Sequence, residues 1–524
     1  MVTVKTWFAQ KENRLLVCKI VAALCFPLLL CIIYCLREGI WIGNISPAGS
    51  MNNDALFYYK QVEGMVESGI PVGFFGFNES HALKGSFAAW IPVVLLPWAI
   101  WGKIFGWSLA SPILCNIILF SVVLGLLVWW IRPTVKQMLV TGAMMALFPG
   151  FSRYLMACLA EAQIFTGFLL MYSLALGYIR KPGKGKLITM FVLAGILSWI
   201  RPYMLLLVFL PGFFLFRQKK VPGVLVTLLV TAADAAIYFL MGHYWTAAYF
   251  TDLYDVSALK LFLTEGIGAG LSNLTAQAGY FVRTLLSYMK NSVTTGMFMG
   301  SNYWILFLLF ILLLPAVWRL WKEKEGLQLF VYIHFLFTAA CSTAALLILM
   351  QKINEGSRHI MSFILVGMLL LGLSTEIRMK DLWRAAIVAL MCIYLYHFFP
   401  DDGQDYQVPV YTGEAREEQV AWEEINSRIE IDLSGDPSYD NTLIWVFSDK
   451  IGEEVVYMPW HHMLSVPGGM GISCCTDSYL MDNWDNLQSR YITTLSDGEI
   501  AKWCEKSGFE KIGEATGKVL YKRY

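Results

Sequence analysis

Apolar runs long enough to cross a membrane recur along this chain from residue 15 to residue 399. Of the 524 residues, 57% are hydrophobic and only 15% are charged, which excludes an ordinary soluble protein. The first run, Leu15–Leu36, has no small-residue cleavage site and exceeds the apolar part of a signal peptide, so we expect it to be retained as a span. The predicted fold class is a polytopic α-helical membrane protein.

Clusters of Lys and Arg predict which ends of the spans face the cytoplasm, because these residues concentrate in cytoplasmic loops. Lys5, Lys11, Arg14 and Lys19 place the N-terminus in the cytoplasm, and the protein is expected in the plasma membrane. With the later basic clusters they predict about eleven spans and an extracytoplasmic C-terminus. Segment 86–105 is interpreted as re-entrant or interfacial; if it crosses, the C-terminus is cytoplasmic instead. The expected spans are 15–36, 111–131, 137–149, 162–179, 187–200, 202–216, 221–241, 303–318, 327–349, 360–376 and 383–399.

Residues 401–524 form a separate acidic domain after the membrane module of residues 1–400. They carry 23 acids and 10 bases, a net charge of −13, against +14 for the rest of the chain. Such a domain is expected to keep away from anionic lipid surfaces. A helix-like stretch at 414–431 and strand-like stretches at 442–447 and 491–495 predict a small extracytoplasmic α/β domain. Nothing in the composition points to nucleic acid.

Two local features of this domain carry further expectations. Residues 512–521 resemble a hairpin that turns at Thr516-Gly517. Three of the eleven cysteines of the chain, Cys474, Cys475 and Cys504, lie here, and a disulfide from Cys504 to one of the adjacent pair is left open.

The first outer loop, residues 37–85, is dense in groups able to do chemistry. Asp54 precedes an aromatic helix-like stretch, and a carboxylate at the membrane surface serves as a general base or as a partner of a divalent cation. Capping of the following helix explains Asp54 without any function. Glu79 and His81 offer oxygen and imidazole to a metal ion, although an ordinary solvated turn explains them as well. Tyr58 and Tyr59 form either a sugar platform or part of an interfacial aromatic belt.

Several cations of the outer segments are candidates for binding phosphate. Arg201 and Arg358 lie between apolar runs with little room to snorkel, and a buried arginine there is costly unless it has a functional partner. The guanidinium fork matches phosphate or pyrophosphate, so we expect the two arginines to meet at the outer membrane edge. Lys84 and Arg153 lie at the interface, where lipid phosphate or simple snorkelling accounts for them.

In the order of these features the chain resembles the GT-C superfamily of membrane glycosyltransferases, which includes protein mannosyltransferases and aminoarabinose transferases. The matching features are Asn53-Asp54 in the first outer loop, the segment with Pro149, Arg153 and Glu161, Arg201-Pro202, Arg358-His359 and the C-terminal outer domain. In this loop the superfamily usually pairs two acids, whereas here Asn53 precedes Asp54.

The resemblance implies inverting transfer of a sugar from a polyprenyl-phosphate donor to an extracytoplasmic glycan, lipid or protein. It implies Asp54 as the catalytic base or a metal partner. The donor phosphate would be bound by Lys84, Arg153, Arg201, Arg358 and His359, the acceptor or its sugar by Tyr58, Tyr59 and Glu161, and a divalent cation, if one is used, by Glu79 and His81.

A polymerase, flippase or transporter of lipid-linked polysaccharide is the alternative. A transporter is expected to place charges at the bilayer midplane and to show an inverted repeat. Here the charges gather at one face and no repeat is evident, which favours the enzyme.

Overall fold

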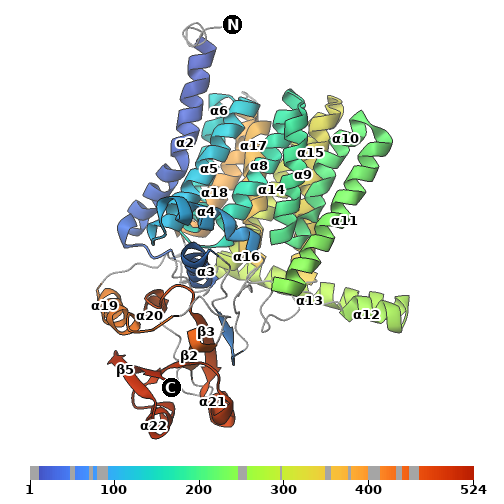
Figure 1. The fold of residues 1–524 in the computed structure, drawn as a ribbon. Coiled ribbons are helices and arrows are strands. Elements are labelled where there is room, and N and C mark those ends of the chain that lie inside the picture. Colours follow the sequence, from blue (N-terminus) through green and yellow to red (C-terminus); the bar gives the residue numbers. More distant parts are fainter. Residues whose placement is uncertain are drawn as a thin grey trace.

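The computed structural model shows a bundle of long helices with a small α/β domain at one end (Figure 1). The structure describes residues 11–47, 54–69, 75–79, 92–245, 257–295, 298–348, 356–375, 379–398, 413–431, 439–447 and 460–524. The predicted fold class, a helical membrane protein with a C-terminal α/β domain, is confirmed by this architecture.

Within the described ranges, six helices are long and apolar enough to cross a membrane. They are α2 (Lys11–Glu38), α5 (Ala110–Ile131), α8 (Ala160–Arg180), α11 (Lys220–Trp245), α14 (Phe298–Lys322) and α15 (Gly326–Ile348). Shorter helices run beside them: α6 (Val135–Leu147), α9 (Lys184–Ile200), η3 (Pro202–Val208) with α10 (Phe209–Gln218), α17 (Met361–Ser374), and α18 (Met379–Ile393) with η4 (Tyr394–Phe398).

Segment 92–105 does not cross the bundle as a helix. It forms η2 (Pro92–Val94) and α4 (Leu96–Phe105), and ten helical residues extend about 15 Å, half of the hydrocarbon thickness. This fits the interfacial or re-entrant interpretation of 86–105. The start of α2 and the α/β domain lie at opposite ends of the bundle, as an odd number of crossings requires (Figure 1). Which end faces the cytoplasm stays a prediction.

At the end of the bundle near the α/β domain, helices are interrupted by residues such as proline, and charged side chains lie at these interruptions. Arg201 has an extended backbone because Pro202 follows it, so α9 ends there and η3 begins. Short helices and connections lie at this end: η1 (Ile42–Asn44), α3 (Asp54–Ser68), α7 (Pro149–Leu155) and α16 (Gly356–His359). Two further helices, α12 (Ser257–Thr264) and α13 (Ile267–Thr295), run across the bundle axis there, as expected of interfacial helices (Figure 1).

The α/β domain contains a six-stranded sheet in the order β1-β3-β2-β4-β6-β5. β2 (Thr442–Phe447) and β4 (Tyr491–Leu495) have the predicted bounds. The predicted hairpin is also present, with positive φ at Thr516 and Gly517 between its two strands. The other strands are β3 (Gly471–Thr476), β5 (Glu510–Ala515) and β6 (Lys518–Lys522), and the helices are α19 (Glu414–Asn426), α20 (Trp460–Leu464), α21 (Asp477–Asn483) and α22 (Glu499–Lys506).

One edge strand of this sheet comes from the first loop. β1 (Phe75–Phe77) pairs in parallel with β3, with Phe75 opposite Ile472 and Phe77 opposite Cys474. The loop and the C-terminal domain therefore share one sheet, although the sequence suggested a boundary near residue 400. All three cysteines of the domain are buried free thiols, so the structure has no disulfide from Cys504.

Candidate active site

Asp54 is the first residue of α3, at the end of the bundle that faces the α/β domain (Figure 1). A carboxylate in the first turn of a helix is favoured by the partial positive charge of the helix N-terminus. The side chain of Asp54 is 29% exposed, so it stays within reach of the aqueous side.

Two arginines converge on two carboxylates beside this helix. Nη2 of Arg358 lies 2.8 Å from Oδ2 of Asp54, and its Nε lies 3.6 Å from Oε1 of Glu161. Nη2 of Arg201 lies 3.1 Å from the same Glu161 oxygen. The two guanidinium groups therefore meet, as the sequence predicts, and Glu161 is the bridge between them.

Three members of this ionic cluster are withdrawn from solvent. The side chains of Glu161, Arg201 and Arg358 are only 4%, 2% and 8% exposed. Buried charges persist only when they are paired, and here two carboxylates balance two guanidinium groups. Nη1 of Arg358 is buried and has no hydrogen-bond partner within the described part of the chain. A buried N–H of this kind is suited to an anionic ligand.

His359 lines the same pocket as the two arginines. Its Nδ1 lies 3.1 Å from the hydroxyl of Tyr203 in η3, and the imidazole is buried. The cluster and its neighbours line a small pocket: Glu161, Ile164, Arg201, Tyr203, Arg358, His359, Met361 and Ser362. The pocket thus collects side chains from α8, the α9–η3 junction, α16 and α17.

Tyr58 and Tyr59 are not surface rings. Both are buried, with the Tyr58 ring 6.2 Å from that of Trp98 and the Tyr59 ring 5.1 Å from that of Trp107. Burial, together with the Asp54 carboxylate, raises the pKa of Tyr58 well above its usual range. Rings packed in this way expose no face to a sugar, which corrects the expected platform. They fix α3 against the bundle instead.

The described lining of this pocket does not include the other two predicted cations, Arg153 and Lys84. Arg153 is buried in α7 with its guanidinium 5.9 Å from the Tyr154 ring, and it is not among the residues that line the pocket. Lys84 lies outside the described residues, as does the predicted metal ligand His81.

Glu79 is used to join the first loop to the C-terminal domain. Its Oε1 accepts hydrogen bonds from the backbone N–H of Ser489 at 2.7 Å, from the Ser489 hydroxyl at 2.5 Å and from the N–H of Gln488 at 3.1 Å. Three donors already satisfy this carboxylate. The described residues contain no group of three or more His, Cys, Asp or Glu side chains placed to hold a metal ion. A divalent cation at Glu79 and His81 stays a prediction.

Sequence reasoning missed Lys60, whose side chain is only 1% exposed. Its ammonium group donates hydrogen bonds to Glu63 and to the backbone carbonyls of Leu464 and Val466. The one available signal is its position three residues after Phe57, on the apolar face of α3.

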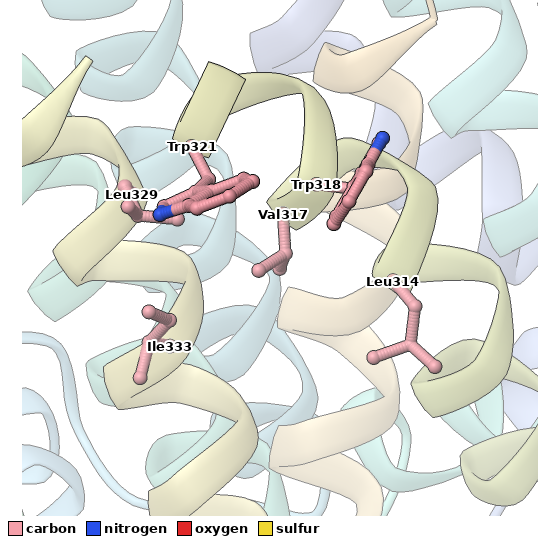
Figure 2. Close-up of a pocket in the computed structure, with 6 residues that line it drawn as sticks. All are labelled: Leu314, Val317, Trp318, Trp321, Leu329 and Ile333. Carbon is pink, nitrogen blue, oxygen red and sulfur yellow. The ribbon is translucent and has the colours of Figure 1, made fainter. Parts of the chain in front are cut away.

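A second pocket in the bundle has a different character. Figure 2 shows this hollow between α14 and α15, lined by Leu314, Val317, Trp318, Trp321, Leu329 and Ile333. These side chains are apolar apart from the indole nitrogens. The last turns of α14 contribute to the hollow, whereas the first turns contact Met361 beside the ionic cluster. It is therefore not part of the candidate site.

No protein-family model and no curated protein sequence matches the chain. The structure is similar to the archaeal oligosaccharyltransferase AglB from Archaeoglobus fulgidus in complex with an inhibitory peptide and a dolichol-phosphate. The identity is 13% and the TM-score 0.48, and the match covers 95% of this chain and 71% of that one. It is also similar to ArnT from Cupriavidus metallidurans bound to undecaprenyl phosphate, at 10% identity and a TM-score of 0.42, over 95% of this chain and 97% of that one. The apo state of ArnT gives 11% identity and a TM-score of 0.40, over 94% and 97%.

Proposed function

We propose that this protein is a membrane glycosyltransferase that moves a sugar from a polyprenyl-phosphate donor to an extracytoplasmic acceptor. The observation that carries the proposal is the ionic cluster, in which Arg358 contacts both Asp54 and Glu161 at the end of an apolar bundle. A lipid-linked phosphate is an anion that reaches such a site from the membrane.

The two arginines supply the charge that a phosphate leaving group needs. A guanidinium fork binds two phosphate oxygens at once. In the resting site these forks are occupied by carboxylates, so the donor phosphate competes with Asp54 and Glu161 for Arg201 and Arg358. Nη1 of Arg358, which has no hydrogen-bond partner among the described residues, is a further donor suited to the phosphate.

Asp54 is the base in this proposal. It takes the proton of the acceptor nucleophile as that group bonds to C1 of the sugar, while the bond from C1 to the phosphate oxygen breaks. The electron pair of the broken bond stays on the polyprenyl phosphate, which Arg201 and Arg358 stabilise. A single displacement of this kind inverts the configuration at C1. Donor binding also frees the base, because the phosphate replaces Asp54 on Arg358.

The acceptor approaches from the side of the α/β domain. Asp54 is the exposed member of the cluster, whereas Glu161 lies behind the arginines and has only 4% of its side chain exposed. Glu161 therefore orients the two guanidinium groups, in place of the acceptor-binding role expected from the sequence. Glu79 is given no part in this step, because its carboxylate accepts hydrogen bonds from Ser489 and Gln488.

Two measurements on the chain in lipid nanodiscs test the proposal. Undecaprenyl phosphate is expected to bind more tightly than undecaprenol, and a panel of undecaprenyl-phosphate sugars is expected to yield one donor that transfers its sugar. Lys184→Gln, at an exposed position on the far end of the bundle, is the matched control and should bind and react normally. Equal binding of the two lipids would refute the phosphate site. Translocation of a lipid-linked glycan without transfer would support the transporter alternative.

A further inference from the structure

Lys60 makes a buried contact with the C-terminal domain, which lies far away in the sequence. Lys60 lies in the middle of α3, and the carbonyl of Leu464, which its ammonium group contacts at 3.3 Å, lies 404 positions later. Its ammonium group also contacts the carbonyl of Val466 and the carboxylate of Glu63. Burying an ammonium group is costly unless its donors are satisfied, and here the C-terminal domain supplies two of the three acceptors.

Further contacts hold the end of α3 and the segment after it. A Cβ atom built on Gly468 would lie 2.3 Å from Oε2 of Glu67, so the last turns of the helix touch the backbone of the C-terminal domain. Beyond the helix, β1 pairs with β3, and Glu79 accepts hydrogen bonds from Ser489 and Gln488. The C-terminal domain thus contacts α3 at its middle and near its end, and also holds the segment that follows it.

We infer that the C-terminal domain sets the position of Asp54 in the ionic cluster, and that Lys60 is the positioning residue through which it acts. Asp54 and Lys60 are six residues apart on one helix, a distance of about 9 Å along its axis. A helix of this length moves as a rigid body, so a shift at Lys60 moves the Asp54 carboxylate relative to Arg358. The inference rests on the proposed function only for the role of Asp54 as the base.

Lys60→Met is the first test, because methionine is an unbranched side chain only one atom shorter than lysine and lacks its three donors. Hydrogen exchange of the α3 amides is expected to accelerate, while undecaprenyl phosphate binding is not weakened, since Arg201 and Arg358 remain. Transfer should lose about 10- to 100-fold in kcat with little change in the donor KM, as a misplaced base predicts. Lys511→Met removes an exposed pair with Glu514 in the same domain and should change none of these values.

A reversible tether separates positioning from a general loss of structure. Glu67→Cys and Gly468→Cys, added to Lys60→Met, place two thiols where the side chain of Glu67 now touches Gly468. Oxidation to a disulfide, verified by peptide mass spectrometry, is expected to restore both α3 protection and kcat, and reduction should remove both. If Lys60→Met fails to fold, Gly468→Val gives the same test from the other partner, because its side chain displaces Glu67.

The outcomes are distinguishable from a failure of the proposed function. Unchanged α3 exchange and kcat in the folded variant, or a verified disulfide that restores neither, would overturn the positioning role. If no donor reacts with the natural chain, the proposed function fails. Hydrogen exchange with and without the tether still decides whether the C-terminal domain positions Asp54.

Discussion

Nη2 of Arg358 lies 2.8 Å from Oδ2 of Asp54, although 304 positions separate the two residues in the sequence. The pair joins the proposed base to the proposed phosphate-binding group before any substrate is present. Each therefore acts as the counter-ion of the other in the resting site. In the proposed reaction a bound phosphate replaces Asp54 on Arg358, and Asp54 is then free to act on the acceptor.

Replacing Asp54 with Asn removes the base and keeps the size of the side chain. We expect turnover to fall by roughly 10²- to 10⁴-fold. Undecaprenyl phosphate should bind as tightly as before or more tightly, because a neutral amide competes less for Arg358. Isothermal titration and a transfer assay measure the two effects. Normal turnover would remove Asp54 from catalysis, and loss of folded protein would assign it to helix capping.

Arg358→Lys tests the guanidinium fork, since a single ammonium group does not reproduce contacts to both Asp54 and Glu161. The affinity for undecaprenyl phosphate is expected to fall about 5- to 150-fold, equivalent to about 1–3 kcal/mol. Arg428→Lys alters an exposed helical pair with Glu424 in the C-terminal domain and serves as the control. An unchanged affinity in Arg358→Lys would place the phosphate elsewhere.

Glu161→Gln leaves two buried guanidinium groups with one carboxylate fewer. Breaking a buried ion pair is expected to lower the free energy of unfolding by about 3–5 kcal/mol, and a thermal melt should show a lower Tm. Saturating undecaprenyl phosphate should restore part of that loss, about 2.7 kcal/mol at 100 times Kd. Glu323→Gln changes a side chain that is 51% exposed and 3.9 Å from Arg319, and it should leave Tm nearly unchanged. A Tm that undecaprenyl phosphate does not raise in Glu161→Gln would contradict the shared-site interpretation.

The thiols of the α/β domain should be poorly reactive. Burial raises the pKa of Cys475 from 9.0 to about 11 and that of Cys504 to about 12. A rise of two pKa units lowers the thiolate fraction about 100-fold at a given pH below both values. Alkylation by iodoacetamide at pH 8 should therefore be slow in the folded protein and fast after unfolding, as followed by peptide mass spectrometry. Recovery of a peptide in which Cys504 is disulfide-bonded would contradict the free thiols.

Membrane orientation follows from the basic clusters and is tested by labelling. Lys511→Cys, exposed in the C-terminal domain, should react with a membrane-impermeant maleimide in intact cells. Lys184→Cys, exposed at the opposite end of the bundle, should react only after permeabilisation. The reverse pattern would invert the protein and place the ionic cluster on the cytoplasmic face.

The parts of this structure that depend on local pattern could be predicted from the sequence. Apolar length predicted the bundle, and strand-like runs rich in β-branched and aromatic residues predicted β2 and β4 with their observed ends. Pro202 indicated that α9 ends at Arg201. Because burying a charged arginine costs free energy, its position between apolar runs indicated that it has an anionic partner.

The remaining features depend on contacts between distant segments. A three-residue strand such as β1 carries too little pattern to be recognised, and its partner lies nearly four hundred residues away. Glu79 was predicted as a metal ligand because it is a carboxylate two residues before a histidine. In the structure it lies beside Ser489 and accepts a hydrogen bond from it. Tyr58 and Tyr59 were predicted to form a sugar platform or an interfacial belt, because nothing local shows that Trp98 in α4 and Trp107 just after α4 cover them.

Because β1 pairs with β3, this part of the protein is able to fold only late in synthesis. Phe75 leaves the ribosome long before Ile472, its partner in the sheet. At ordinary translation rates the delay is roughly 20 to 80 s, during which the intervening helices enter the membrane. The first loop must wait through that interval with an unpaired strand edge, and a chain truncated before β3 never completes it. Assembly of the candidate site is therefore tied to synthesis of the last strands of the chain.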